Sequence, residues 1–251
     1  MRGVILAGGT GSRLFPLTKV TNKHLLPVYD KPMIYYPLEC MAKAGIEEVL
    51  LVTGGNNAGD FIRLLGNGRE FGFKNLNYTY QEGAGGIAQA LGLAEHFAEG
   101  ESICLILGDN IVEYKLSESV KRFRHQGQGA KILLSQVENP RAYGVAEMDG
   151  ERVVRIVEKP KEPKSNWAVI GIYFYDAKVF DIVKTLKPSA RNELEITDVN
   201  NEYIRRGEMT ADQISGWWAD AGENIDFYLK ACNQVAQSGA NKEPATAAAR
   251  Q

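Results

Sequence analysis

The sequence contains few of the residues that build metal clusters and disulfide frameworks. Its 251 residues include three cysteines and three histidines, all widely spaced. Cys40, Cys104 and Cys232 match no zinc-binding or disulfide spacing, so we interpret them as buried thiols in a reducing cytoplasm. The histidines likewise show no ligand spacing, which argues against a zinc site.

Long apolar runs and a charge excess of one sign are also missing. No stretch reaches the roughly 20 apolar residues that a membrane-spanning helix needs, and the first residues predict a strand rather than a signal peptide. The net charge is −2, so we expect neither a nucleic-acid polymer nor an anionic membrane as a partner. With 44% hydrophobic and 24% charged residues, the composition is typical of a globular domain.

The most informative segment of the sequence is the glycine-rich run LAGGTGSRLFPLT at residues 6–18. It follows a short apolar run at residues 4–6, Arg13 closes it, and Lys23 comes ten residues later. Glycines let backbone N–H groups approach phosphate oxygens closely, and two cations can neutralise a polyphosphate. The segment therefore predicts binding of a nucleoside triphosphate.

Two better-known phosphate loops do not fit. A Walker A loop needs a Gly-Lys pair followed by Ser or Thr, which the chain lacks. A Rossmann fingerprint needs a third glycine where Leu14 stands, and the expected strand at 48–53 ends without an acidic residue. A plain glycine turn remains as an alternative, but it does not explain Arg13, Pro16 and Lys23 behind it.

The first half of the chain alternates apolar runs with helical patterns. The runs, which we expect to form buried parallel strands, are residues 4–7, 48–53, 76–80 and 102–109, and the expected helices are 32–45, 58–68 and 86–98. This alternation predicts an α/β fold with a doubly wound sheet that binds ligands at the carboxyl ends of its strands. The glycine-rich segment and Asp109 both come at such ends.

The second half is richer in strands. These are expected at 130–137, 144–149, 152–160 and 168–176, with a turn at Asp149-Gly150 and helices near 176–186, 195–206 and 223–237. Since no repeats or linkers interrupt the pattern, we expect one domain over 1–237 with an inserted lobe. Residues 238–251 lack apolar periodicity and are expected to form a disordered tail.

Several motifs resemble those of the sugar-1-phosphate nucleotidyltransferases. In chain order they are LAGGTGSRLFPLT (6–18), KHLLPV (23–28), Gln81 with Gly86, GDN (108–110), YGV (143–145), EKP (158–160), LEITDVN (194–200) and WWADAG (217–222). The resemblance covers nearly the whole chain. It implies a Rossmann-like, doubly wound mixed sheet, with a nucleotide-binding part at about 1–130 and a sugar-binding part at about 131–222.

The resemblance also implies a reaction. A sugar-1-phosphate oxygen would attack the α-phosphorus of a nucleoside triphosphate and expel pyrophosphate. The likeness is greatest to family members that use dTTP and α-D-glucose-1-phosphate, at the first step towards dTDP-deoxysugars such as dTDP-rhamnose. Mg²⁺ would be the cofactor and a homotetramer the assembly. Because phosphate oxygens are already nucleophilic, catalysis would rest on positioning and charge neutralisation.

The resemblance implies roles for individual residues. Arg13, Lys23 and Lys159 would be catalytic, the first two at the triphosphate and Lys159 at the sugar phosphate. The implied nucleotide contacts are Leu6, Gly8, Gly9, Thr10, Gly11, Arg13, Lys23, Gln81, Gly86 and Asp109, with Gln81 and Gly86 at the base. The implied sugar-phosphate contacts are Asn110, Gly144, Glu158, Lys159 and Val169.

Asp109 and Asp220 are the expected metal ligands. Mg²⁺ binds proteins through one or two carboxylates and completes its shell with phosphate oxygens and water. A helix cap or a turn is the alternative role for such an Asp. The chain departs from its relatives at two places: Ala221 stands where they often have threonine, and residues 82–85 replace a proline-rich turn.

Three alternatives remain open. The first keeps the enzyme class and changes the substrate to UTP, CTP or another hexose phosphate, since one glutamine does not exclude uracil. A non-catalytic subunit would tend to lose the charged residues that this chain keeps, and a glycosyltransferase usually has an Asp-x-Asp motif where this chain has GDN. We assign Glu195, Thr197 and Asp198 to a helix start, and the tryptophans to the core or an interface.

Overall fold

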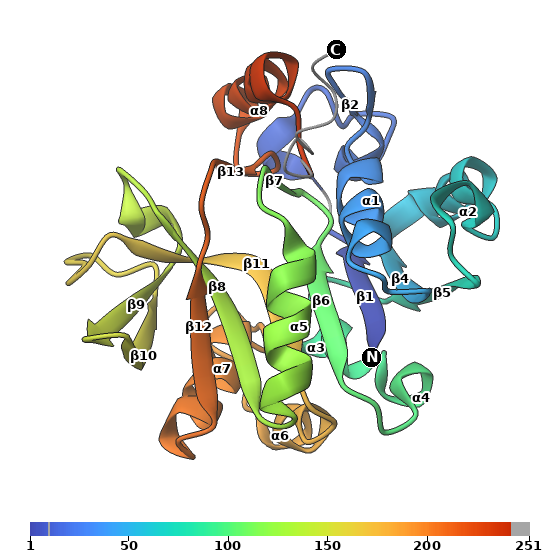
Figure 1. The fold of residues 1–251 in the computed structure, drawn as a ribbon. Coiled ribbons are helices and arrows are strands. Elements are labelled where there is room, and N and C mark those ends of the chain that lie inside the picture. The colour runs from blue at the N-terminus through green and yellow to red at the C-terminus, as the bar shows by residue number, and fades with distance from the viewer. Residues whose placement is uncertain (10, 242–251) are drawn as a thin grey trace, which may run out of the picture.

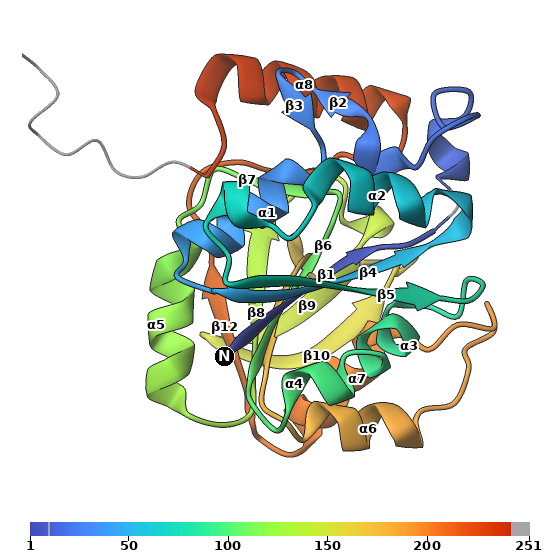
Figure 2. The same cartoon turned by 90° about the vertical axis from the view of Figure 1, so that its right-hand side faces the viewer.

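A computed structural model describes residues 1–9 and 11–241 of the chain. Its centre is a mixed sheet of nine strands. Helices lie on both faces of this sheet (Figures 1 and 2). Four strands are parallel, namely β1 (Arg2–Ala7), β4 (Glu48–Gly54), β5 (Asn75–Gln81) and β6 (Ile103–Leu107). Because β1 lies between β4 and β6, the predicted doubly wound α/β sheet is confirmed.

The other five strands make the sheet mixed. They are β8 (Ala130–Gln136), β9 (Gly144–Asp149), β10 (Arg152–Glu158), β11 (Trp167–Tyr175) and β12 (Met209–Gln213). β11 runs antiparallel to β6 and pairs with both β8 and β9, so it joins the strand-rich lobe to the parallel half. β9 and β10 form a hairpin across the predicted turn at Asp149-Gly150.

Two layers of helices cover the sheet (Figure 2). One contains α1 (Tyr35–Lys43), α2 (Ala58–Leu65) and α5 (Leu116–Gln126), and the other α3 (Ile87–Gly92), α4 (Glu95–Ala98), α6 (Val179–Thr185) and α7 (Ile196–Arg205). Successive strand residues point to opposite faces, so Ile5 packs under the first layer and Leu6 under the second. Both faces are therefore apolar, which explains the unbroken apolar runs. None of the described helices is long and apolar enough to cross a lipid bilayer.

Some helices and strands were not expected from the sequence. In α5 only Leu116, Val120 and Phe123 are buried apolar residues, and the rest of the helix is mostly polar. The short strands β7 (Asn110–Val112), β12 and β13 (Trp218–Asp220) were also missed. The single helix expected over 86–98 is divided into α3 and α4 by a tight turn, in which Ala94 N donates to Leu91 O.

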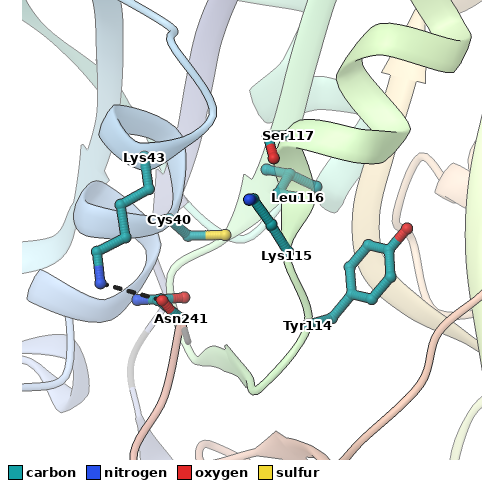
Figure 3. Close-up of a pocket in the computed structure, with 7 residues that line it drawn as sticks. All are labelled: Cys40, Lys43, Tyr114, Lys115, Leu116, Ser117 and Asn241. Carbon is teal, nitrogen blue, oxygen red and sulfur yellow. Dashed lines mark hydrogen bonds between the residues drawn. The ribbon is translucent and has the colours of Figure 1, made fainter. Parts of the chain in front are cut away.

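The last described helix is α8 (Ile225–Ser238), which packs against β13, β2 (Pro27–Val28) and α1. The predicted start of a disordered tail at Ser238 is wrong, because Ser238 still belongs to α8 and Asn241 is buried. The N–H of Asn241 donates to Val112 O, its side-chain amide donates to Tyr36 O, and Lys43 Nζ donates to its carbonyl (Figure 3). Residues 242–251 of the expected tail lie outside the described residues.

The small pocket beside Asn241 is separate from the candidate site. Figure 3 shows its lining side chains, among them Cys40, Tyr114 and Ser117. Its volume is about 10 Å³, enough for about one water molecule. It is therefore too small to hold a substrate.

Candidate active site

A cleft of about 360 Å³ opens at the carboxyl ends of the parallel strands. The residues expected at the site line this cleft, with the exceptions of Thr10 and Gly11. Thr10 lies outside the described residues. Gly11 instead turns the chain: its φ of 62° is in the left-handed region, and its carbonyl accepts a hydrogen bond from Thr18 Oγ1 at 2.8 Å. The residues expected at the nucleotide and those expected at the sugar thus share one cavity.

Both candidate triphosphate cations are held by carboxylates. Arg13 Nη1 lies 2.6 Å from Glu223 Oε2, and Lys23 Nζ lies 2.5 Å from Asp109 Oδ2. The Arg13 side chain is 56% exposed and the Lys23 side chain 18% exposed, so the Arg13 pair lies nearer the solvent. An exposed ion pair contributes at most about 1 kcal/mol, so an incoming polyphosphate can readily replace Glu223 at Arg13.

Asp109 and Asp220 meet because strand pairing joins distant segments. Asp109 follows β6, and β13 pairs antiparallel with β7 so that Asp220 lies opposite Asn110. The N–H of Ala221 donates to the backbone carbonyl of Asp109 at 2.9 Å. Ala221 is fully buried, so the methyl group that replaces the expected hydroxyl faces no solvent. Both carboxylates line the cleft.

The buried charges affect one another strongly. Burial alone would raise the pKa of Asp109, but the positive charge of Lys23 and the other neighbouring groups, among them the hydrogen bonds from Lys23 and Asn110, together outweigh burial and hold that pKa far below its ordinary value. Burial and the negative charge of Asp109 raise the pKa of Asp220 to about 7. Burial and the charge of Lys23 lower the pKa of His24 to about 3, so this imidazole is neutral. Asp109 is thus firmly ionised, whereas Asp220 takes up a proton near neutral pH.

This pair of carboxylates fits a divalent cation. Over the described residues, no group of three or more His, Cys, Asp and Glu side chains is placed to hold a metal ion. A cation at Asp109 and Asp220 would therefore take its remaining ligands from phosphate oxygens and water. Burial and the negative charge of Asp109 raise the pKa of Asp220, and a cation held between the two carboxylates would favour the ionised form of Asp220.

Glu158, the last residue of β10, and Lys159, which follows it, also line the cleft. Glu158 pairs with Gly144 in the hairpin and its Oε2 accepts a hydrogen bond from Thr197 Oγ1 at 2.7 Å. Lys159 has a φ of 43°, a left-handed conformation that costs about 1–2 kcal/mol for a residue with a Cβ. Within the described part of the chain, the Lys159 ammonium has no ion-pair or hydrogen-bond partner. The Lys159 ammonium thus lines the cleft without a partner among the described residues.

Most of the hydrogen-bonding groups of the Asn110 side chain are occupied by partners within the protein. Its Oδ1 accepts hydrogen bonds from Gly171 N at 2.9 Å and from Trp218 Nε1 at 2.7 Å. Its Nδ2 donates to Asp109 Oδ1 at 3.0 Å. An amide nitrogen has two N–H groups, so one remains for the sugar contact that was expected of Asn110.

The segment expected at the base and a segment near the residues expected at the sugar share backbone hydrogen bonds. The N–H of Leu194 donates to Gly85 O at 2.8 Å, and the N–H of Ala88 donates to Leu194 O at 3.1 Å. A Cβ at Gly86 would lie 2.5 Å from Leu194 O, so glycine is needed for this approach. The segment with Gln81 and Gly86 is therefore fixed to the segment that leads into α7.

Several residues of the cleft were not expected there from the sequence. They are Tyr143, Arg191, Glu193, Glu195, Thr197, Trp218 and Glu223. Glu195 does precede α7, as expected, but its carboxylate binds Arg191 at 2.7 Å and does not cap the helix. Trp218, which was assigned to the core or an interface, lines the cleft. The motifs LEITDVN and WWADAG were the available signals for Glu195, Thr197 and Trp218.

Known proteins place the chain in a family. The nucleotidyl transferase family matches residues 2–238. The chain belongs to this family. A glucose-1-phosphate thymidylyltransferase of Neisseria meningitidis is 46% identical over 233 residues, which cover 91% of this nucleotidyl transferase and 80% of the relative. The family expected from the sequence motifs is thus confirmed.

Solved structures of other nucleotidyl transferases share the fold. A Bacillus anthracis protein assigned as a glucose-1-phosphate thymidylyltransferase, in complex with sucrose, aligns with a TM-score of 0.90 at 50% identity and covers 95% of this chain and 96% of its own. A UDP-glucose pyrophosphorylase complexed with UDP-glucose aligns with a TM-score of 0.81 at 26% identity, covering 94% and 98%.

In this nucleotidyl transferase, Gly222 makes room for the Lys23–Asp109 pair. A Cβ at position 222 would lie 2.4 Å from Asp109 Oδ2 and 2.6 Å from Lys23 Nζ. We expect Gly222→Ala to displace both side chains and lower kcat about 100-fold, since shifts of about 1 Å can cost this much. The melting temperature should change little, because the ends of both side chains can move. Turnover assays and thermal unfolding measure the two effects.

Gly59→Ala is the matched control for Gly222→Ala. A Cβ at Gly59 would have no atom within 4 Å, and the residue lies in α2. This variant should keep wild-type turnover. If Gly222→Ala also turned over at the wild-type rate, the positions of Lys23 and Asp109 would not be critical for catalysis.

Proposed function

We propose that this protein is a glucose-1-phosphate thymidylyltransferase, which converts dTTP and α-D-glucose-1-phosphate into dTDP-glucose and pyrophosphate with Mg²⁺. One observation carries the proposal: a single cleft contains Arg13 and Lys23 on the nucleotide side, Asp109 and Asp220, and Lys159 on the sugar side. The thymidylyltransferases among its relatives support this choice of substrates.

The reaction needs positioning and charge neutralisation more than proton transfer. An oxygen of the sugar phosphate attacks the α-phosphorus of dTTP and forms a new P–O bond. The bond from the α-phosphorus to the oxygen that bridges to the β-phosphorus breaks, and its electron pair leaves with pyrophosphate. Because the nucleophile is already an anion, no base has to remove a proton, and the neutral His24 is not required as one.

Each charged group then has a defined task. Arg13 and Lys23 exchange their carboxylate partners for phosphate oxygens and stabilise the charge that develops on pyrophosphate. Lys159 binds the sugar phosphate, and Glu158 accepts hydrogen bonds from sugar hydroxyls while Thr197 fixes its orientation. Asp109 and Asp220 would hold Mg²⁺, which neutralises phosphate charge and helps to orient the triphosphate when bound.

Release of pyrophosphate tests the proposal directly. Purified protein is incubated with Mg²⁺, α-D-glucose-1-phosphate and each of dTTP, UTP, CTP, ATP and GTP in turn. We expect the fastest release with dTTP, and none when the sugar phosphate is omitted or the metal is chelated. No release with any of the five nucleotides, or release that does not depend on the sugar phosphate, would contradict the proposal.

Uridylyl transfer is the second candidate. Uracil offers the same polar edge as thymine, and the thymine methyl group adds only an apolar contact. The shared fold with a UDP-glucose pyrophosphorylase supports this candidate. In the same assay, a rate with UTP equal to or above that with dTTP would favour it.

Glu223 should compete with dTTP for Arg13. Glu223→Gln removes the negative charge that pairs with Arg13 at 2.6 Å. We expect the KM for dTTP to fall about two- to fivefold, because an exposed pair contributes at most about 1 kcal/mol, and the difference should shrink in high salt. Glu118→Gln, at a surface pair with Lys121, is the control and should have no effect. A raised KM in Glu223→Gln would mean that Glu223 assists binding.

We also propose that the protein is a cytoplasmic homotetramer at the first step of dTDP-deoxysugar synthesis, for example towards dTDP-rhamnose. Ile225 and Leu229 lie one turn apart on α8 and are 43% and 57% exposed. Apolar side chains exposed together on one helix face support a subunit contact there. Sedimentation equilibrium should give four times the chain mass, and a monomer would contradict the tetramer.

A further inference from the structure

The side chain of Gln81 has both of its donor groups occupied. Its Nε2 lies 3.2 Å from the backbone carbonyl oxygen of Gly86 and 2.8 Å from Oε1 of Gln89. A primary amide nitrogen carries two N–H groups, so these two acceptors use both of them. Gln81 is only 8% exposed, and it lines the cleft.

The oxygen of the same amide is left as an acceptor for a ligand. Gln81 Oε1 lies over the glycine-rich segment, 3.1 Å from where a Cβ of Gly8 would be, and no described group donates a hydrogen bond to it. The nucleotide side of the cleft therefore presents an acceptor at this point. Among the pyrimidines, thymine and uracil carry an N3–H that can donate to it, whereas N3 of cytosine is itself an acceptor.

This orientation depends on the two groups that bind Nε2. The Gly86 carbonyl can only accept, so turning the Gln81 amide over would bring two oxygens together. Gln89 adds a second acceptor from α3, and its amide packs against Gly85, where a Cβ would lie 2.2 Å from it. Gln89 does not line the cleft, so it acts on a nucleotide only through Gln81.

We propose that Gln89 is a positioning residue that holds the oxygen of Gln81 towards the base, and that it thereby selects pyrimidines with an N3–H over cytosine. The inference rests on the proposed function, which identifies the substrate as a nucleoside triphosphate. The inference takes the base of this substrate to lie beside Gln81. It separates dTTP and UTP from dCTP and leaves the choice between dTTP and UTP to other contacts.

The ratio of kcat/KM for dTTP to kcat/KM for dCTP tests this role. Gln89→Leu removes the acceptor, and we expect the ratio to fall about five- to tenfold, the equivalent of one lost hydrogen bond. Gln89→Glu keeps an acceptor of the same shape, so the ratio should stay within about twofold of wild type, although the added charge lowers the affinity for both triphosphates. If Gln89 were purely structural, its replacement would lower kcat/KM for dTTP and for dCTP by the same factor and leave the ratio unchanged.

Two results would overturn the proposal: an unchanged ratio in Gln89→Leu, or an equal fall in Gln89→Leu and Gln89→Glu. Failure of the proposed function is recognised separately, as a wild-type protein that releases no pyrophosphate with any nucleotide. In that case calorimetry would give the dissociation constants of dTTP and dCTP for the wild type, Gln89→Leu and Gln89→Glu. The ratio of the two dissociation constants would then replace the ratio of kcat/KM values. Equal ratios across the three proteins would again reject the role of Gln89.

Discussion

Asp109→Asn should lower kcat at least about 1,000-fold, because a metal-binding carboxylate supports several kcal/mol of charge stabilisation in the transition state. Asparagine has the same shape and keeps the backbone contact between Asp109 O and Ala221 N. It cannot, however, supply the negative charge that faces Lys23 at 2.5 Å. We therefore expect a folded protein that hardly turns over, measured as Mg²⁺-dependent pyrophosphate release together with circular dichroism.

The control for this variant is Asp181→Asn, which makes the same substitution at a side chain that is 85% exposed on α6. It should keep full activity. If Asp109→Asn retained near-normal rates that still depend on Mg²⁺, Asp109 would not belong to the metal site. If the variant lost its fold, Asp109→Glu would test the same ligand with the charge preserved.

Lys159→Ala should affect the sugar phosphate far more than dTTP. Among the described residues this ammonium has no carboxylate partner, so its charge is available for a phosphate. We expect kcat/KM for glucose-1-phosphate to fall about 1,000-fold, by comparison with other cations of phosphoryl transfer, while the KM for dTTP changes little. Initial rates with each substrate varied in turn give the two constants.

Two further variants make the Lys159 result specific. Lys161→Ala removes a neighbouring charge outside the cleft and should behave as wild type. Lys159→Arg keeps the charge and should recover part of the activity. A loss of dTTP binding in Lys159→Ala, with binding of glucose-1-phosphate unaffected, would mean that this lysine binds dTTP and that its assignment to the sugar phosphate is wrong.

The parallel strands β1, β4 and β6 were predictable because strands that are buried on both faces become unbroken apolar runs. Asp109 could be placed in the cleft for the same reason, since it directly follows one of these runs. The short strands β7 and β13 have too few residues for any periodicity, so their pairing was not predictable. The meeting of Asp220 with Asp109 could be expected only from motif resemblance.

Residues with two compatible roles were the hardest to assign from sequence. Thr197 and Glu195 stand at a helix start, where small polar and acidic residues are common. Only the folded chain shows that Thr197 donates to Glu158 and that Glu195 binds Arg191. Trp218 is similar, because a tryptophan in an apolar segment indicates burial and does not indicate that its ring nitrogen binds Asn110.

The backbone bonds of Leu194 to Gly85 and Ala88 limit how this enzyme can be redesigned. A chimaera that imports residues 81–88 from a relative with another nucleobase keeps these bonds only if the imported backbone follows the same path beside Leu194. Where the path differs, the graft would have to include residues 193–195 as well, and so part of the segment expected at the sugar. Base preference and sugar preference are therefore expected to be inherited together, as one exchangeable unit.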